Sequence, residues 1–303
     1  MCVMDLDLFS SSSNEPLFDK EDKTLTKKEV VAQKSKRRKT EMDRKEQNKE
    51  EILKSCIEYF KGDTLAADVW INKYALRDGN KVYELNPDEM HRRLAREFAR
   101  IEHKYKNPLS EDDIYELLKD FKYIIPQGSP MAGIGNNFQV VSLSNCFVIG
   151  NPANSDSYGG ILKIDQEQVQ LMKRRGGVGH DLSHIRPKMS PVKNSALTST
   201  GIVPFMERYS NTTKEVAQGG RRGALMLSIS IKHPDAEDFI DAKMELNKIT
   251  GANVSVRIDD EFMRCVVSGK PYKQQFPINS DNPSVIKEID ARELWKKIIH
   301  NAW

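Results

Sequence analysis

The 303-residue sequence contains no run of eighteen apolar residues, the length at which a membrane-spanning helix becomes a candidate, so no transmembrane segment is predicted. It also lacks an N-terminal apolar core followed by a small-residue cleavage site, which argues against a secretory signal. The sequence also lacks a strong excess of charge of one sign, because it has 47 Lys and Arg residues and 44 Asp and Glu residues. The net charge of +3 is too small to indicate that the chain as a whole binds nucleic acid.

Cysteine is scarce, and its spacing excludes the usual metal-binding patterns. Cys2, Cys56, Cys146 and Cys265 lie far apart, with no CxxC pair and no histidine at zinc-ligand spacing. Scattered thiols of this kind are typical of a reducing cytoplasm, where an important cysteine is reactive rather than a structural cross-link. We therefore expect a cytoplasmic protein without a membrane anchor.

The first 50 residues have the composition of a tail. They contain a serine run at 10–13 and a basic run at 34–39, with few large apolar residues. Such a segment buries too little surface to offset its ordering entropy, so a solvated flexible tail is predicted. Contact of the basic run with phosphate backbones, or a targeting role, remains an alternative.

Residues 51–125 have the pattern of a helical domain. Apolar residues recur at helical spacing from Ile52 to Phe60. Asn86, followed by Pro87, and Ser110 are expected to begin two further helices, because both side chains can cap a first turn.

From residue 126 onward the pattern predicts an α/β domain. Strands are expected over 138–149, 224–231 and 253–258, and helices over 165–174, 202–218 and 235–244. A last helix is expected to begin at Asp290. The alternation of strands and helices indicates largely parallel strand pairing. We interpret the end of the sequence at Trp303 as a cut within the domain.

Three polar or glycine-rich segments are candidates for chemistry. The first, residues 126–133, leads to Cys146, which lies among short hydroxyl and amide side chains, although a buried structural cysteine is the simpler interpretation. The second, residues 173–181, has glycines that allow a ligand to approach the backbone, but it matches no established phosphate-loop pattern. The third, residues 218–224, could present two arginines to a ligand or could be a solvated turn.

Several motifs in these segments resemble one family. SLSNCFVIG, Asp156-Ser157, LMKRRGGVGHDLSHIRPKMSPV, QGGRRGALM, HPDAEDFIDAKM and NVSV occur in the order seen in ribonucleotide reductase large subunits. The resemblance covers about residues 51–303. The amino-acid sequences of these motifs are most similar to those of the adenosylcobalamin-dependent (class II) bacterial enzymes. It implies an N-terminal helical domain at 51–125, followed over 126–303 by the first half of a ten-stranded α/β barrel.

The resemblance also implies roles for individual residues. Cys146 matches the first of two cysteines that reduce the ribose and become a disulfide. Ser129, Asn145 and Gly177 match residues at the bound substrate.

A second group of matching residues concerns regulation. Asp156 and Arg186 match the site that binds a deoxynucleoside triphosphate effector at a dimer interface. The loop that couples this effector to substrate choice matches Gln218, Gly219, Gly220, Arg221, Arg222 and Gly223.

The implied activity is reduction of ribonucleotides to deoxyribonucleotides for DNA synthesis, with adenosylcobalamin as radical source and a thioredoxin-type protein as reductant. The remaining cysteines of the family's site would lie beyond Trp303, so we expect this chain alone to be inactive. Two alternatives stay open: a class I large subunit with a metal-radical partner protein, and a non-catalytic fragment that binds effectors or dimerises.

Overall fold

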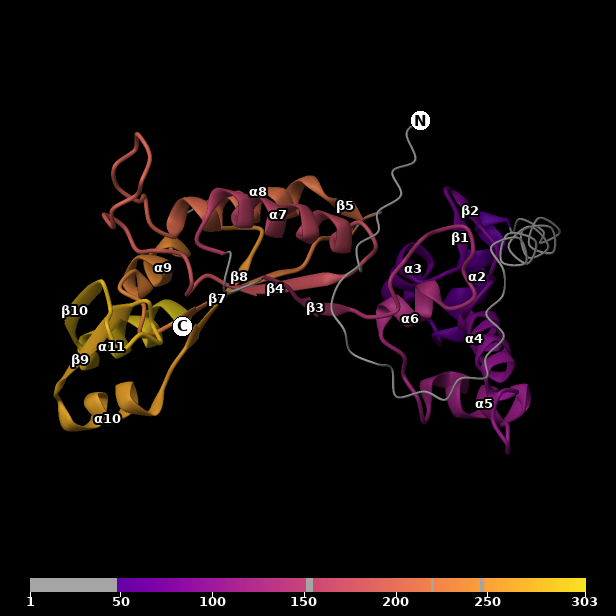
Figure 1. The fold of residues 1–303 in the computed structure, drawn as a ribbon. Helices are drawn as coiled ribbons and strands as arrows, with labels where there is room; N and C mark the ends of the chain where they lie inside the picture. Colours follow the sequence, from indigo (N-terminus) through magenta and orange to yellow (C-terminus); the bar gives the residue numbers. More distant parts are fainter. Residues whose placement is uncertain (1–47, 151–154, 219–220, 246–247) are drawn as a thin grey trace. The chain divides into compact units, whose positions relative to one another are not determined.

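The computed structural model describes residues 48–150, 155–218, 221–245 and 248–303 (Figure 1). Of the tail predicted for residues 1–50, residues 1–47 lie outside the described part of the chain. None of the described helices is long and apolar enough to cross a lipid bilayer.

The N-terminal part is mainly helical, as the sequence predicts. Its helices are α2 (Lys49–Tyr59), α3 (Thr64–Lys73), α4 (Pro87–Glu102), α5 (Glu111–Leu118) and α6 (Gly128–Gly133), with a 3-10 turn at Lys119–Phe121. The expectation of helix throughout residues 51–125 is wrong in one place, where β1 (Arg77–Asp78) and β2 (Lys81–Val82) form a short antiparallel ladder. Gly79, at φ +57°, provides the left-handed residue that this tight connection requires.

The predicted helix starts are confirmed. The Asn86 side chain caps α4, and the Glu89 carboxylate reaches back to the backbone N–H of Leu85 at 2.8 Å. Ser110 and Asp113 cap α5 reciprocally, each side chain accepting from the other's backbone N–H. The apolar stripe predicted for α2 is confirmed in part, because Ile52 and Cys56 are buried at 2% and 0% exposure whereas Leu53 is 44% exposed.

The second part is built on a four-stranded parallel sheet. Its strands are β3 (Cys146–Val148), β4 (Gly177–Asp181), β7 (Leu225–Ser230) and β8 (Asn253–Arg257), in the order β3-β4-β7-β8. Every neighbouring pair in this sheet is parallel, which confirms the α/β class. The crossover helices are α7 (Tyr158–Met172), α8 (Val203–Glu215) and α9 (Ala236–Ala242).

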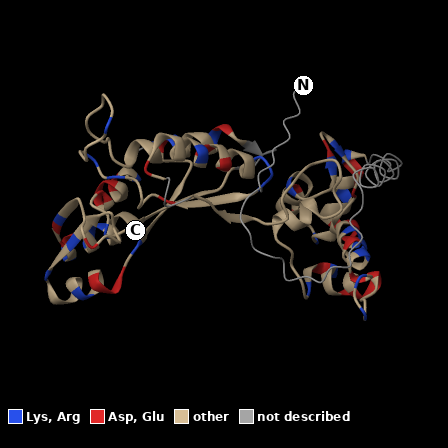
Figure 2. Cartoon of the chain, in the orientation of Figure 1, with Lys and Arg blue, Asp and Glu red and all other residues tan. Residues whose placement is uncertain are grey.

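One face of the sheet carries the core. α7 and α8 lie over this face in Figure 1, and the apolar side chains of β4 and β7 that point toward them are almost completely buried. Charged residues are rare on the sheet itself, whose strands contain only Asp181 and Arg257 (Figure 2).

The C-terminal segment adds elements that the sequence pattern did not reveal. They are α10 (Asp260–Ser268) and an antiparallel hairpin of β9 (Pro271–Phe276) and β10 (Val285–Asp290), followed by α11 (Ala291–Ala302). α11 begins at Asp290 as predicted, because its carboxylate accepts from the N–H groups of Arg292 and Glu293.

Three expectations need correction. The strand expected over 138–149 is confined to Cys146–Val148, since the side chains of Asn136 and Ser142 hydrogen-bond nearby backbone groups in the preceding segment. The glycine-rich segment 173–181, over which no strand was expected, contains β4, one of the two inner strands of the sheet. The loop expected over 218–224 contains β6 (Arg221–Arg222), which pairs antiparallel with β5 (Ala217–Gln218).

Candidate functional site

The face of the sheet opposite the helices, here called the open face, carries the candidate thiol. Side chains alternate along each strand, so Val178 and His180 of β4 are buried while Gly177 and Gly179 lie on the open face. Cys146 is exposed on this face, and Val148 is 92% exposed. A sheet face lined by small residues leaves room for a ligand to lie against the strands.

Cys146 lies directly opposite Gly177 in the β3–β4 register. A Cβ atom at Gly177 would come within 3.1 Å of the Asn145 carbonyl oxygen and 3.3 Å of the Ala224 Cβ. Glycine at this position therefore lets the backbones on both sides of β4, at Asn145 and Ala224, approach closely and keeps the space beside Cys146 open.

Ser129 and Asn145 are brought together at the start of β3. Ser129 is fully buried in α6, and its backbone N–H donates to the Asn145 side-chain oxygen at 3.1 Å. The Asn145 amide donates in turn to the Gln127 side chain, and the Ser129 hydroxyl donates to the Arg175 carbonyl at 3.4 Å. The residues that the sequence analysis assigned to the substrate thus lie in one hydrogen-bonded group next to Cys146.

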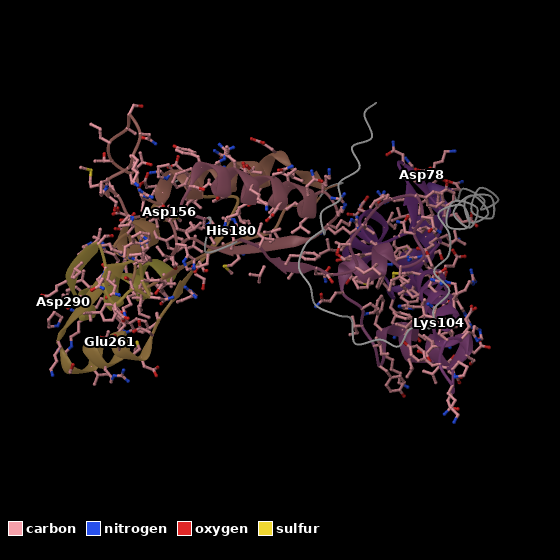
Figure 3. All side chains as sticks on the ribbon, viewed as in Figure 1. Asp78, Lys104, Asp156, His180, Glu261 and Asp290 are labelled. Carbon is pink, nitrogen blue, oxygen red and sulfur yellow. The ribbon has the colours of Figure 1, made fainter. Side chains whose placement is uncertain are left out.

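On its buried face, the strand that carries Gly177 contacts a polar group formed by His180, which Figure 3 labels, and by residues of α7 and α8. Gln168 of α7 donates both amide hydrogens, to the Tyr209 carbonyl at 2.9 Å and to the Thr213 hydroxyl at 3.1 Å. Its oxygen is then left to accept from Nε2 of His180 at 3.3 Å, which assigns the proton to that nitrogen. Burial lowers the pKa of His180 to about 4, so the ring is neutral at pH 7.

An ion pair that the sequence analysis missed crosses the open face. Arg257 of β8 donates to the Asp181 carboxylate of β4 at 2.8 Å, across the intervening strand β7. Asp181 also accepts from the hydroxyls of Ser183 at 2.8 Å and Ser228 at 3.2 Å. These residues link the carboxyl ends of three parallel strands, which is where α/β sheets commonly bind ligands.

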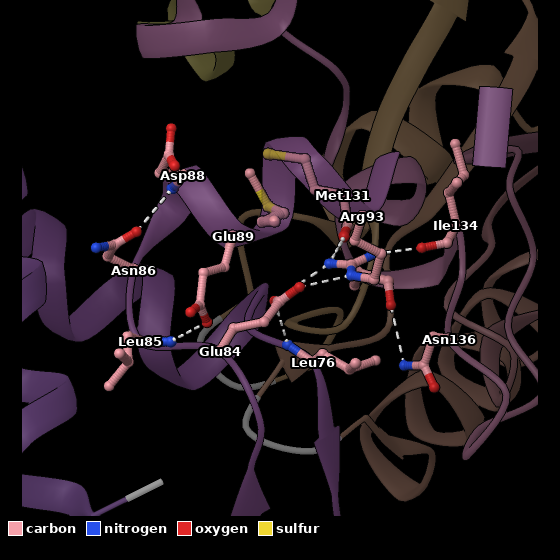
Figure 4. Close-up of polar contacts among 12 residues, drawn as sticks. Leu76, Glu84, Leu85, Asn86, Asp88, Glu89, Arg93, Met131, Ile134 and Asn136 are labelled. Atoms are coloured by element: carbon pink, nitrogen blue, oxygen red, sulfur yellow. Dashed lines mark hydrogen bonds and ion pairs between the residues drawn. The ribbon is translucent and has the colours of Figure 1, made fainter. Parts of the chain in front are cut away.

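A second missed contact holds α6 in place (Figure 4). The Arg93 guanidinium pairs with the Glu84 carboxylate at 2.7 Å, and it donates to the carbonyls of Met131 at 2.9 Å and of Ile134. The Glu84 carboxylate also accepts from the Leu76 N–H at 2.8 Å. Arg93 thereby satisfies carbonyls in the last turn of α6, the helix that carries Ser129.

Asp156 and Arg186 form a separate site. The Arg186 Nε lies 2.9–3.0 Å from both Asp156 oxygens, and its Nη2 lies 2.9 Å from one of them. The Asp156 carboxylate also accepts from the Arg186 backbone N–H at 2.9 Å. This contact raises the pKa of the Arg186 guanidinium, which therefore stays charged.

The Asp156–Arg186 pair borders a cavity of about 780 Å³, here called the Asp156–Arg186 pocket. Its other walls include Tyr158 and Phe205, from the first turns of α7 and α8, and residues of the segment 191–200. A cavity of this size, with an apolar wall and a fixed cation, suits a nucleotide-sized anion.

The predicted coupling loop is described only in part. Gly219 and Gly220 lie outside the described residues, and for Gln218, Arg221 and Arg222 only the strand pairing of the backbone is described. Gly223 lies next to α8, where an added Cβ would meet the Thr213 side chain at 3.1 Å.

The other described cysteines lie in different surroundings. Cys56 is buried in α2, where desolvation raises its pKa to about 12 and its Sγ donates to the Leu85 carbonyl. Cys265 is partly buried in α10. Within the described ranges, no group of three or more His, Cys, Asp or Glu side chains could hold a metal ion.

Comparison with known proteins agrees with this architecture. The family model for the ribonucleotide reductase all-alpha domain matches residues 60–136, and the model for the ribonucleotide reductase barrel domain matches residues 144–303. The second match alone covers more than half of the chain.

Three curated relatives illustrate the similarity. The vitamin B12-dependent ribonucleoside-diphosphate reductase of Thermoplasma acidophilum is 35% identical over 163 residues, which is 53% of this chain and 20% of the relative. The protein of the same name from Mycobacterium tuberculosis is 28% identical over 238 residues, or 77% of this chain and 33% of the relative. The ribonucleoside-diphosphate reductase subunit alpha of Helicobacter pylori is 26% identical over 267 residues, or 80% of this chain and 33% of the relative.

The chain thus spans between 20% and 33% of the length of these relatives. The two family models follow one another in the same order as the helical part and the parallel sheet. The chain therefore belongs to the ribonucleotide reductase family, with its all-alpha domain and barrel-domain sequence.

Proposed function

We propose that this chain forms part of a ribonucleotide reductase and supplies one of the two thiols that reduce the ribose. The observation that carries the proposal is the position of Cys146, exposed on the open face opposite Gly177 and next to the Ser129–Asn145 group. In the overall reaction the C2′–O bond of the ribose breaks and a C2′–H bond forms. The 2′-hydroxyl leaves as water, and two thiols become one disulfide.

In this proposal the polar group beside Cys146 positions the substrate. Ser129 and Asn145 hold one another in fixed geometry, and Arg93 holds the helix that carries Ser129. Gly177 keeps the sheet surface free of side chains where the nucleotide would lie. Neither of the other described cysteines is suited to be the partner thiol. Cys56 is buried, and Cys265 lies in α10. We accordingly propose that the 303-residue chain alone is inactive.

For the radical source we propose adenosylcobalamin, since relatives from Thermoplasma and Mycobacterium are named vitamin B12-dependent. When bound, that cofactor would supply a carbon-centred radical by homolysis of its cobalt–carbon bond. The small polar residues around Cys146 do not themselves form a cradle for a corrin ring. Similarity to the Helicobacter subunit alpha keeps a metal-radical partner protein as the alternative.

The partners follow from the same proposal. The substrate is a ribonucleotide, and the Asp156–Arg186 pocket takes a deoxynucleoside triphosphate effector. Arg222 and its neighbours couple that effector to substrate choice. We further propose a homodimer that is reduced by a thioredoxin-type protein in the cytoplasm.

A second candidate function is effector binding without catalysis by this chain. The observation that favours it is the Asp156–Arg186 pocket, whose walls all come from described residues of this chain. In contrast, the described residues offer a single exposed thiol.

The test of the main proposal is Cys146→Ser in a complete reductase that contains this sequence. We expect thioredoxin-driven turnover to be lost, while the control Cys265→Ser keeps it. Normal turnover by the Cys146 variant would show that this thiol is not a reductant.

A further inference from the structure

A cavity of about 520 Å³, here called the α11 cavity, lies among the C-terminal elements. Its walls come from α9, the β9–β10 hairpin and α11, and none of the residues assigned to the thiol, substrate or effector sites borders it. Four carboxylates but only two lysines line the cavity, and the carboxylates belong to Glu237, Asp241, Asp290 and Glu293. An acidic cavity attracts a cationic ligand.

A buried glutamine distinguishes this cavity from a solvated acidic surface. Gln274 lines the cavity from the buried face of β9 and is 0% exposed. Its Nε2 donates to the Ile231 carbonyl at 2.9 Å, whereas no group of the described chain donates to its Oε1. The amide cannot be turned around, because its oxygen would then face the Ile231 carbonyl oxygen. A buried acceptor without a donor costs about 1–3 kcal/mol, and a ligand that donates to it recovers this energy.

The contacts of Lys297 show which kind of cation the α9 side of the cavity holds. The Lys297 Nζ lies 2.6 Å from the Glu237 carboxylate and 3.0 Å from the Asp241 carboxylate. These two acidic residues are four positions apart on α9 and therefore share one face of the helix. They raise the pKa of the Lys297 ammonium, Glu237 more than Asp241. This side of the cavity thus stabilises an alkylammonium group.

The first turn of α11 offers a second carboxylate position. Asp290, labelled in Figure 3, already accepts from two N–H groups at the start of the helix. Glu293 is more accessible, because its pair with Lys296 at 2.7 Å joins side chains that are 68% and 72% exposed. An exposed pair of this kind contributes at most about 1 kcal/mol, so an incoming ammonium group can replace Lys296.

The cavity also has an apolar surface, formed by Ile289 and by Leu294, which is 5% exposed. An inorganic cation would not use such a surface. The described side chains also form no group of three or more His, Cys, Asp or Glu residues that could hold a metal ion. Separated acceptors beside apolar side chains instead suit an alkyl chain that carries more than one ammonium group.

From these observations we propose that the α11 cavity binds a linear aliphatic diamine or polyamine. One ammonium group donates to the Oε1 of Gln274, and another pairs with the Glu293 carboxylate. The alkyl chain between them lies against Ile289 and Leu294. The α11 cavity shares no wall residue with the proposed effector site, so this inference is independent of the proposed function.

Calorimetry of the 303-residue chain with 1,4-diaminobutane, spermidine and butylamine, at constant ionic strength, tests the proposal. The first two ligands should bind saturably. Butylamine, which represents a single ammonium group such as a lysine side chain of a partner protein, should bind about 5-fold more weakly or worse, because it loses one ion pair.

Variants locate the binding site. Glu293→Gln should weaken binding of 1,4-diaminobutane by about 2–5-fold, the scale of one exposed ion pair. Glu288→Gln is the matched control, because it removes the same charge from an exposed residue of β10 that does not line the cavity, and it should leave the affinity unchanged. Gln274→Met should weaken binding by about 10-fold or more, the scale of a hydrogen bond to a charged group.

The proposal is wrong if neither 1,4-diaminobutane nor spermidine binds, or if butylamine binds as tightly as they do. It is also wrong if Glu288→Gln weakens binding as much as Glu293→Gln, since the protein's overall charge would then be responsible. Displacement of 1,4-diaminobutane by equimolar magnesium chloride would likewise contradict it, because the cavity would then accept any cation.

Discussion

Arg93 and Glu84 form an ion pair whose side chains are only 3% and 4% exposed, and which also satisfies the Met131 carbonyl and the Leu76 N–H. Two charges so far from water are stable because each has several partners. Through its bonds to the carbonyls of Met131 and Ile134, the pair connects α4 to the helix that carries Ser129.

We predict that Arg93→Met lowers the free energy of unfolding by about 3–5 kcal/mol, because the Glu84 carboxylate is left buried and unpaired. Arg100→Met is the matched control, since the Arg100–Glu97 pair lies on the exposed side of the same helix and is worth at most about 1 kcal/mol. Urea unfolding of both variants measures the difference. Equal losses in the two variants would contradict the special role of the buried pair.

Acid should destabilise the protein through three buried histidines of the described chain, His91, His180 and His233. Burial lowers the pKa of all three from an ordinary value of 6.5, and it lowers those of His180 and His233 to about 4. As pH falls below 6.5 these residues bind protons in the unfolded chain but not in the folded chain, so stability is lost between pH 6.5 and 4. The loss is about 3 kcal/mol for each of His180 and His233 and ends below pH 4, where these two are protonated in the folded state too.

Denaturant midpoints measured from pH 7 to 4 test this prediction. His180→Phe should reduce the slope of stability against pH by removing one of the three buried histidines, whatever its effect at pH 7. His103→Gln, a change at an exposed histidine, should keep the full slope. A slope that survives replacement of His180 would place the acid sensitivity elsewhere.

Gly177→Ala should cost about 1–3 kcal/mol, because the new methyl group would lie 3.1 Å from the Asn145 carbonyl oxygen, which belongs to the backbone and cannot easily move. Gly179→Ala is the control on the same strand and face, with its nearest neighbour at an ordinary 3.7 Å. Thermal unfolding compares the two. Equal stability of both variants would show that β3 and β4 adjust freely.

Arg186→Ala should weaken binding of deoxynucleoside triphosphates by about 1.5–3 kcal/mol, the scale of a charged hydrogen bond. Arg208→Ala is the control, because Arg208 pairs with Asp165 at 3.0 Å and does not line the Asp156–Arg186 pocket. Calorimetry with all four triphosphates measures the effect. Unchanged affinities in the Arg186 variant would move the phosphate site away from this pocket.

Local sequence signals predicted many of the elements. The caps at Asn86, Ser110 and Asp290 depend on contacts within a few residues, so the residues themselves reveal them. The alternation of apolar residues over 224–231 likewise predicted β7, and a strand was also expected over 253–258, where β8 lies. In contrast, β4 has glycine at two of its five positions, which removed the periodic signal by which a strand is recognised.

The sequence by itself determined the helical and α/β parts, the candidate thiol Cys146 and the candidate pair Asp156 and Arg186. Only the tertiary structure decided which distant residues meet. Arg257 reaches Asp181 although 76 positions separate them, and the loop after β9 approaches Ser183 and His184 to form a cavity. The physical reason is that caps and alternation arise from neighbouring residues, whereas ion pairs across strands and cavities between loops exist only once packing has brought separate elements together.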